Sequence, residues 1–169
     1  MTADEVIALL DLAPGATCGY VRLTYAATDR IAPDGLPAPF ESGRPMGSAL
    51  YFLVTPQAPV QLHRIRNDQL YHYYLGDPLE VLLMHDDGAA ERVVVGPDLA
   101  AGQLVQLFIP GGTFHTARLV PGGRWFLGAS TEWPGVEPQD VELGDMDVLA
   151  AKYPAVEAHI RSFPVPAAG

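Results

Sequence analysis

Turn signals recur along most of this sequence at a spacing that leaves room only for short strands. From residue 19 onward, brief apolar runs alternate with turn-forming residues such as Gly76-Asp77-Pro78 and Gly122-Gly123. Short runs bounded by Gly, Pro, Asn and Asp in this way are typical of antiparallel sandwiches and barrels. We therefore predict an all-β fold with strands at 19–25, 48–54, 59–65, 70–75, 79–84, 91–95, 104–109, 115–119 and 124–131.

Helical periodicity is confined to the two ends of the chain. Thr2 and Glu5 form a capping-box pattern ahead of apolar residues at helical spacing, which predicts a short helix at 2–11. Toward the C-terminus, apolar residues at Met146, Leu149, Tyr153, Val156 and Ile160 predict one or two short helices, with a break at Pro154.

The domain organisation follows from where turn-forming residues gather. Residues 29–47 contain four prolines and three glycines, so we predict a long loop there, lying over one mouth of a barrel. We expect residues 1–163 to form one domain and residues 164–169 to form a flexible tail.

Acidic residues outnumber basic residues, which limits the partners of the protein. The 169 residues include 20 Asp and Glu against 10 Lys and Arg, giving a formal net charge of −10. Nucleic-acid phosphates and anionic lipid surfaces repel such a chain, so we expect neither as a partner. The lone Cys18 excludes an internal disulfide, and we find no basic leader, membrane span or Gly-rich phosphate loop. These features predict a cytoplasmic protein without a nucleotide cofactor.

Three histidines stand in or beside predicted strands and are the candidates for chemistry. Because strand residues alternate between faces, His63 is expected to share a face with Gln61 and Ile65. By the same rule His115 shares a face with Ala117 and Leu119, so both imidazoles can point into a barrel. His72 lies three residues after Gln69, and a regular strand cannot direct both of them inward.

Two stretches of the sequence resemble the two motifs of the cupin superfamily. The first motif is matched by His63, Gln69 and Gly76, with the expected six-residue gap before the Gly. The second motif is matched by Gly102, Pro110, Gly112 and His115, with a longer gap after Gly102. The closer resemblance is to a subfamily of small cupins called cupin five. It is carried by residues 62–72 and by Gly19-Tyr20, Thr24-Tyr25, Gly96-Pro97-Asp98-Leu99, Pro110-Gly111-Gly112 and Pro134-Gly135, and it covers about 6–163.

The resemblance implies a cupin-type jelly-roll barrel with the terminal helices packed outside it, and it implies a homodimer. The sequence departs from the family pattern in the pocket. Gln69 stands where the family has Glu, Leu23 stands where a further Glu is expected, and His115 stands where the family has Gln. We therefore expect a pocket that is poor in carboxylates and uses imidazoles.

Three functions remain open for this pocket, and each involves a small molecule. In the first, His63, Gln69 and His115 bind one divalent transition metal such as Fe, Zn, Mn or Ni. In the second, acid–base catalysis without a metal uses His63, His72, His115 and Tyr73. Either would serve an isomerase, dehydratase, decarboxylase or oxygenase, and a role in specialised metabolite biosynthesis is plausible.

In the third function, the barrel binds a sugar-like ligand without catalysis, at a degenerate site. For all three, the candidate substrate contacts are Tyr20, Arg22, Tyr51, Arg64, Gln69 and Phe114. The two arginines are included because a guanidinium binds a carboxylate or phosphate group well.

Overall fold

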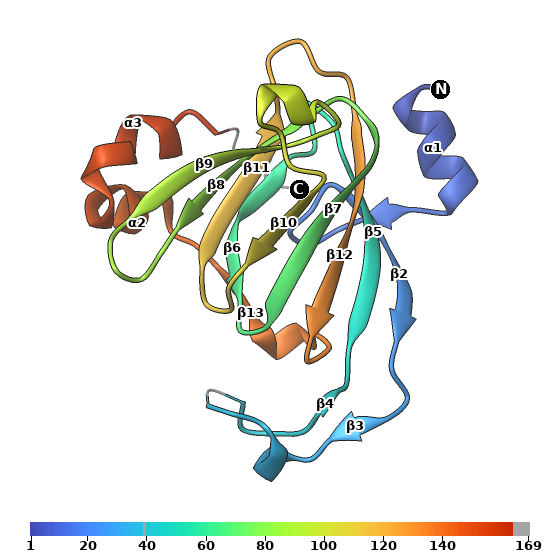
Figure 1. Cartoon of the computed structure of the whole chain (residues 1–169), viewed down its shortest axis with the longest axis vertical. Helices are drawn as coiled ribbons and strands as arrows, with labels where there is room; N and C mark the ends of the chain where they lie inside the picture. Colours follow the sequence, from blue (N-terminus) through green and yellow to red (C-terminus); the bar gives the residue numbers. More distant parts are fainter. Residues whose placement is uncertain (39, 164–169) are drawn as a thin grey trace.

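Two antiparallel sheets face one another and enclose the core in the computed structural model, which describes residues 1–38 and 40–163 (Figure 1). The larger sheet has the strand order β1-β2-β5-β12-β7-β10, and the second sheet has the order β13-β6-β11-β8-β9. The strands of the larger sheet are β1 (Ala13–Pro14), β2 (Tyr20–Ala26), β5 (Ser48–Val54), β7 (Asp68–Gly76), β10 (Gln106–Ile109) and β12 (Phe126–Trp133). The strands of the second sheet are β6 (Val60–Ile65), β8 (Leu79–Met84), β9 (Ala90–Val95), β11 (Phe114–Leu119) and β13 (Val141–Leu143).

The helices lie outside this barrel, as the sequence predicts. Helix α1 (Ala3–Leu10) begins with the predicted capping box between Thr2 and Glu5 and packs against the larger sheet. Helices α2 (Met146–Lys152) and α3 (Glu157–Ile160) are separated by the 3-10 turn η4 (Pro154–Val156), which confirms the break at Pro154. Among the described residues, none of the helices has both the length and the apolar character needed to cross a membrane.

Strand β8 shows why the second sheet forms where it does. All its residues are buried, because one face points into the barrel and the other lies under the C-terminal helices. Leu79, Val81 and Leu83 join the barrel core, whereas Leu82 and Met84 pack with the α2–α3 segment. The apolar run at 81–84, which follows Glu80, therefore reflects burial on both faces of the strand.

The segment at residues 29–47 differs from the predicted loop. It contains the short strands β3 (Arg30–Ile31) and β4 (Arg44–Pro45), which pair with each other, and the turn η1 (Pro33–Gly35). We call residues 29–38 and 40–47 the arm, and Figure 1 shows it projecting from one end of the barrel instead of lying across its mouth. The predicted tail at 164–169 lies outside the described residues.

Candidate functional site

A cavity of about 280 Å³ lies between the two sheets at the end of the barrel nearest the arm. Its apolar lining consists of Leu23, Leu50, Ile65, Val136, Pro138 and Val141. Its polar lining consists of Thr17, Cys18, Ser48, His63, Gln69, Tyr71, Ser130 and Glu132. Leu23 is 62% exposed, so the cavity reaches the surface at this side chain.

Strand register brings the polar groups of the larger sheet together. In β12, residues Ser130 and Glu132 are two apart and point to the same face of the strand. Glu132 stands opposite Gln69 of β7 on one side and opposite Ser48 of β5 on the other. Ser130 stands opposite Tyr71, and its hydroxyl donates to Gln69 Oε1 at 3.3 Å.

A β-bulge in the second sheet directs His63 into the barrel. His115 pairs with His63, but Ala117 pairs with Val60, so β6 carries one more residue than β11 over this stretch. Val60 and His63 are therefore both buried, and Gln61 instead donates to Ala16 O outside the barrel. The predicted common face of His63 and Ile65 is present in the cavity, whereas the predicted position of Gln61 on that face is wrong.

The two buried imidazoles lie against each other with their ring centroids 4.3 Å apart. Nδ1 of His63 lies 2.8 Å from Gln61 O, and Nδ1 of His115 lies 3.1 Å from Thr113 O. Because a carbonyl oxygen can only accept, each Nδ1 carries the proton and each Nε2 keeps the lone pair. Burial lowers the pKa of His63 to about 4. Burial and the neighbouring His63 hold the pKa of His115 well below its usual value.

Tyr71 connects the cavity to His115, which lies directly behind the lining. The Tyr71 hydroxyl lies 3.1 Å from His115 Nε2, and it must donate this bond because that nitrogen can only accept. Burial raises the pKa of Tyr71 well above its usual value, so the phenol stays protonated. Burial also raises the pKa of the neighbouring Cys18 thiol to about 11.

Glu132 corrects the expectation of a pocket poor in carboxylates. Its side chain is buried, lines the cavity and accepts a hydrogen bond of 2.6 Å from Ser48 Oγ. The same Ser48 Oγ accepts from Val136 N at 3.1 Å, which fixes the direction of the hydroxyl. Burial raises the pKa of Glu132, because a carboxylate is poorly solvated there.

Ion pairs fasten the arm to the rim of the cavity. The turn η3 (Pro138–Asp140) contributes Pro138 to the lining, and Asp140 accepts two hydrogen bonds from the buried Arg44 guanidinium at 2.6 and 2.8 Å. Arg30 adds a bond of 2.7 Å to Glu137. These contacts hold η3, and with it one wall of the cavity, against the base of the arm.

His72 and Tyr73 do not join this site. His72 lies on the outer face of β7, where Nε2 is 2.9 Å from Thr131 Oγ1 and Nδ1 is 3.2 Å from the Gln106 amide. Tyr73 packs against the barrel core, but its hydroxyl donates to Gly76 O at 2.8 Å, and it is not among the lining residues. Of Gln69 and His72, which are three residues apart in the chain, only Gln69 therefore points into the barrel.

Most of the predicted substrate contacts also lie elsewhere. Tyr20 and Tyr51 pack beside helix α1, and Arg22 donates to Leu10 O. Arg64 pairs with Glu142 and stacks over the ring of Phe114, which packs with the C-terminal helices. The structure therefore brings together only His63, Gln69 and His115 from the predicted set.

The polar lining residues that sequence reasoning missed include Ser48, Ser130 and Glu132. The alternation of strand residues between faces could have found Ser130 and Glu132, because both continue the inward face of β12 that begins at Phe126. The predicted strand at 124–131 ended one residue before Glu132, so this carboxyl was left outside the sheet.

Two of the three predicted metal ligands, His63, Gln69 and His115, are already engaged by protein groups. Among residues 1–38 and 40–163, no group of three His, Cys, Asp or Glu side chains is arranged to hold an ion. His115 Nε2 already accepts from Tyr71, and Gln69 Oε1 accepts from Ser130. We therefore derive no reaction step through a metal.

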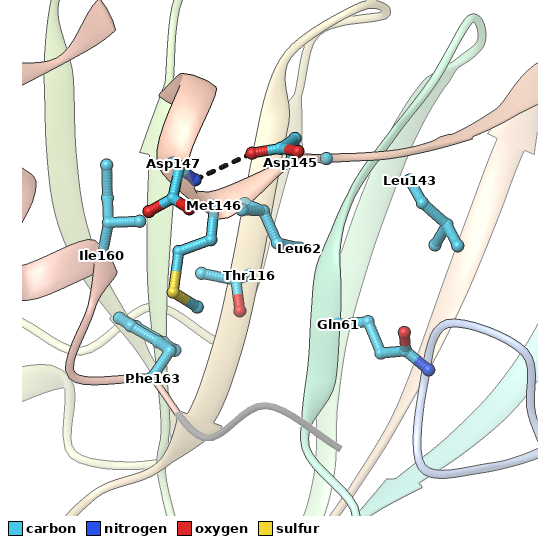
Figure 2. Close-up of a pocket in the computed structure, with 10 residues that line it drawn as sticks. Gln61, Leu62, Thr116, Leu143, Asp145, Met146, Asp147, Ile160 and Phe163 are labelled. Atoms are coloured by element: carbon cyan, nitrogen blue, oxygen red, sulfur yellow. Dashed lines mark hydrogen bonds between the residues drawn. The ribbon is translucent and has the colours of Figure 1, made fainter. Parts of the chain in front are cut away.

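A second, larger groove of about 390 Å³ lies outside the barrel, between the second sheet and the C-terminal helices. Figure 2 shows Met146, Ile160 and Phe163 lying across from Leu62 and Thr116. Its carboxylates already have structural roles, because Asp145 caps α2 through its Oδ1, and Asp147 pairs with Arg161. We therefore place the candidate site in the barrel cavity.

The facing sheets and the cavity between them are those of a cupin-type jelly roll. Residues 4–144 match the family described as "Cupin superfamily (DUF985)", and the chain belongs to this family. The predicted fold and subfamily are thereby confirmed.

Three further proteins are similar to this chain in sequence or in structure. The chain is 26% identical to uncharacterized protein YML079W of Saccharomyces cerevisiae over 100 residues, which are 57% of this chain and 50% of the yeast protein. The match thus spans about half the length of that relative. A hypothetical protein from Leishmania major has 27% identity and a TM-score of 0.84, covering 96% of this chain and 98% of that one. Protein SO0799 from Shewanella oneidensis has 25% identity and a TM-score of 0.83, covering 98% and 99%.

A more distant likeness concerns the fold alone. Oxalate decarboxylase of Bacillus subtilis, a protein with Mn(II) centres, has 15% identity and a TM-score of 0.50. That likeness covers 92% of this chain and 38% of the decarboxylase.

Proposed function

We propose that this cupin is a small-molecule enzyme that catalyses an isomerisation or dehydration by acid–base chemistry in the barrel cavity. One observation carries the proposal: an unprotonated imidazole and a buried carboxyl with a raised pKa line the same small cavity from opposite sheets. Titratable groups whose surroundings shift their pKa values in opposite directions are a frequent feature of acid–base sites.

His63 is the proposed base. Its Nδ1 proton is held by Gln61 O, so Nε2 offers a lone pair at neutral pH. For a hydroxy-carbonyl substrate, the C–H bond next to the carbonyl breaks and the proton moves to His63 Nε2. The electron pair moves to the carbonyl oxygen, which takes the proton of Glu132 and gives an enol.

The two groups support each other electrostatically. Proton removal alone would leave an unpaired imidazolium in a buried site, and proton donation alone would leave an unpaired carboxylate. Acting together, His63 and Glu132 develop opposite charges in one cavity, and their attraction offsets part of the cost of burying each charge. In an isomerisation, His63 returns its proton to the former carbonyl carbon, while the hydroxyl on the carbon that lost the proton gives its own proton to Glu132. In a dehydration, a hydroxyl group on the next carbon takes the proton from His63 and leaves as water, while the enol gives its O–H proton back to Glu132.

Tyr71 and His115 act as positioning residues in this proposal. Because Tyr71 donates its proton to His115 Nε2, the phenol oxygen presents lone pairs to its other neighbours. A substrate hydroxyl in the cavity can donate to this oxygen, which would fix the substrate relative to His63.

The proposal is tested by hydrogen exchange in D2O. We suggest incubating the protein with hydroxy-carbonyl compounds of different charge, and following loss of the proton next to the carbonyl, and any elimination, by proton NMR. We expect turnover of at least one compound, with a loss of about a hundredfold or more in His63→Asn and Glu132→Gln. His72→Asn is the matched control, since His72 lies on the outer face.

Two results would contradict the proposal. One is turnover that both cavity variants retain. The other is the absence of exchange and elimination for every compound that binds the cavity, which would make this cupin a binding protein.

A further inference from the structure

The charges around the cavity limit which molecules can enter it. All ten Lys and Arg residues lie within the described part of the chain, and none of them lines the cavity. Arg22 and Arg64, the predicted anion contacts, are bonded to Leu10 O and to Glu142. Arg44, the basic residue fixed to the cavity rim, is saturated by Asp140, Ser42 and Gly43.

A bound anion would therefore find no compensating cation among the residues that line the cavity. Transfer of an unpaired charge from water to a buried site is strongly unfavourable. The net charge of −10 adds a long-range repulsion of the same sign.

The hydrogen-bonding groups that line the cavity also restrict which ligands can bind, independently of charge. Two of the polar groups characterised above, His63 Nε2 and the Tyr71 oxygen, present lone pairs, whereas the Gln69 amide offers N–H donors. Buried acceptors need donors, so a fitting ligand brings O–H groups of its own. The apolar lining, including Leu50, Ile65 and Val141, suits the carbon skeleton that carries these hydroxyls.

The volume of the cavity limits the size of the ligand. Ligand pockets commonly measure about 300–1,000 Å³, so a cavity of about 280 Å³ suits a molecule smaller than a nucleotide.

We propose that the cavity binds a small uncharged molecule that presents several hydroxyl groups, and that it rejects the carboxylate counterpart of the same molecule. This proposal rests on the proposed function only in placing the ligand in the same cavity. It names the substrate class as a neutral polyhydroxy compound, such as an unmodified monosaccharide or an open-chain hydroxy-carbonyl compound.

The test compares ligands of similar size in which one group is neutral, anionic or cationic. We suggest two series, glucose with glucuronate and glucosamine, and glyceraldehyde with glycerate and 3-amino-1,2-propanediol. Binding is followed at pH 7 by saturation-transfer NMR and by the dissociation constant from titration. We expect the neutral member of at least one series to bind about tenfold or more tightly than its anionic and cationic counterparts.

Variants locate the binding and probe its cause. Val136→Trp fills the cavity from a loop at its rim and should abolish binding, whereas Val105→Trp, at an exposed bend, should not. Glu132→Gln replaces the proton-bearing carboxyl with an uncharged amide of nearly the same volume, so the preference for neutral over anionic ligands should persist, because it depends on the lack of a cation in the lining.

The inference is overturned if an anion binds as tightly as its neutral counterpart, if a cation binds more tightly, or if no neutral compound binds. It is also overturned if binding survives in Val136→Trp. These outcomes are separate from failure of the proposed function. Neutral ligands that bind without hydrogen exchange in D2O would refute the proposed catalysis but support this inference. Hydrogen exchange of anionic compounds would support the proposed catalysis but refute this inference.

Discussion

The buried His63 imidazole makes the stability of this protein depend on pH in a calculable way. In the unfolded chain the pKa of His63 returns to about 6.5, whereas burial lowers it to about 4 in the folded protein. As pH falls below 6.5, the unfolded state therefore binds a proton that the folded state does not. Stability is fully present above pH 6.5, falls as pH decreases, and stops falling below the folded pKa of about 4.

The magnitude follows from these two pKa values. Between pH 7 and pH 5, protonation of the unfolded chain at His63 lowers the free energy of unfolding by about 2 kcal/mol. Urea unfolding at the two pH values measures this loss in the wild type and in His63→Asn, whose amide can still donate to Gln61 O. We expect the wild type to lose about 2 kcal/mol more than the variant.

A control separates this effect from other titrations. His72 is partly exposed on the outer face, so His72→Asn should change the pH dependence much less than His63→Asn. His63→Asn also relieves the repulsion that His63 exerts on His115, and the measured difference therefore belongs to the coupled pair. Equal pH dependence in the wild type and in His63→Asn would refute a buried, unprotonated His63, and with it the proposed base.

Three further predictions concern other parts of the molecule. Burial raises the pKa of Cys18 to about 11, so native protein at pH 8 should react with a thiol reagent such as DTNB about a hundredfold more slowly than unfolded protein; equal rates would contradict its burial. Arg44→Ala leaves Asp140 buried without its partner and should lower the free energy of unfolding in urea by about 3 kcal/mol, whereas a loss below about 1 kcal/mol would mean that the pair contributes little. The expected homodimer has a candidate surface on the outer face of the larger sheet, where Phe108 and Trp133 are 53% and 51% exposed; light scattering should give twice the 18.1 kDa chain mass, and changing both residues to Lys should give the monomer.

The fold could be predicted from the sequence because turn residues and apolar runs agree along the chain. The predicted strands at 48–54 and 79–84 coincide with β5 and β8, and the capping box of α1 is present as predicted. These features depend on neighbouring residues, which a sequence displays directly. The short strand β13 was missed, because only its pairing with β6 over three residues defines it.

The site was harder to predict because it depends on which face of each strand turns inward. A bulge in β6 shifts that face between Val60 and His63, and no local feature of the sequence marks the bulge. Glu132 was missed for a related reason, since a carboxyl at a strand end resembles a solvent-exposed residue until its cross-strand neighbours are known. His115 was found because it lies in a predicted strand and matches the second motif of the cupin superfamily.

The pair between Arg44 and Asp140 joins positions that are 96 residues apart in the chain. Contacts of such long sequence separation carry a loop-closure cost, so we expect this pair to form late in folding. One wall of the cavity would then become fixed only after most of the barrel strands have been brought together. The cavity would stay open while the core forms, and its last wall would form when the arm docks.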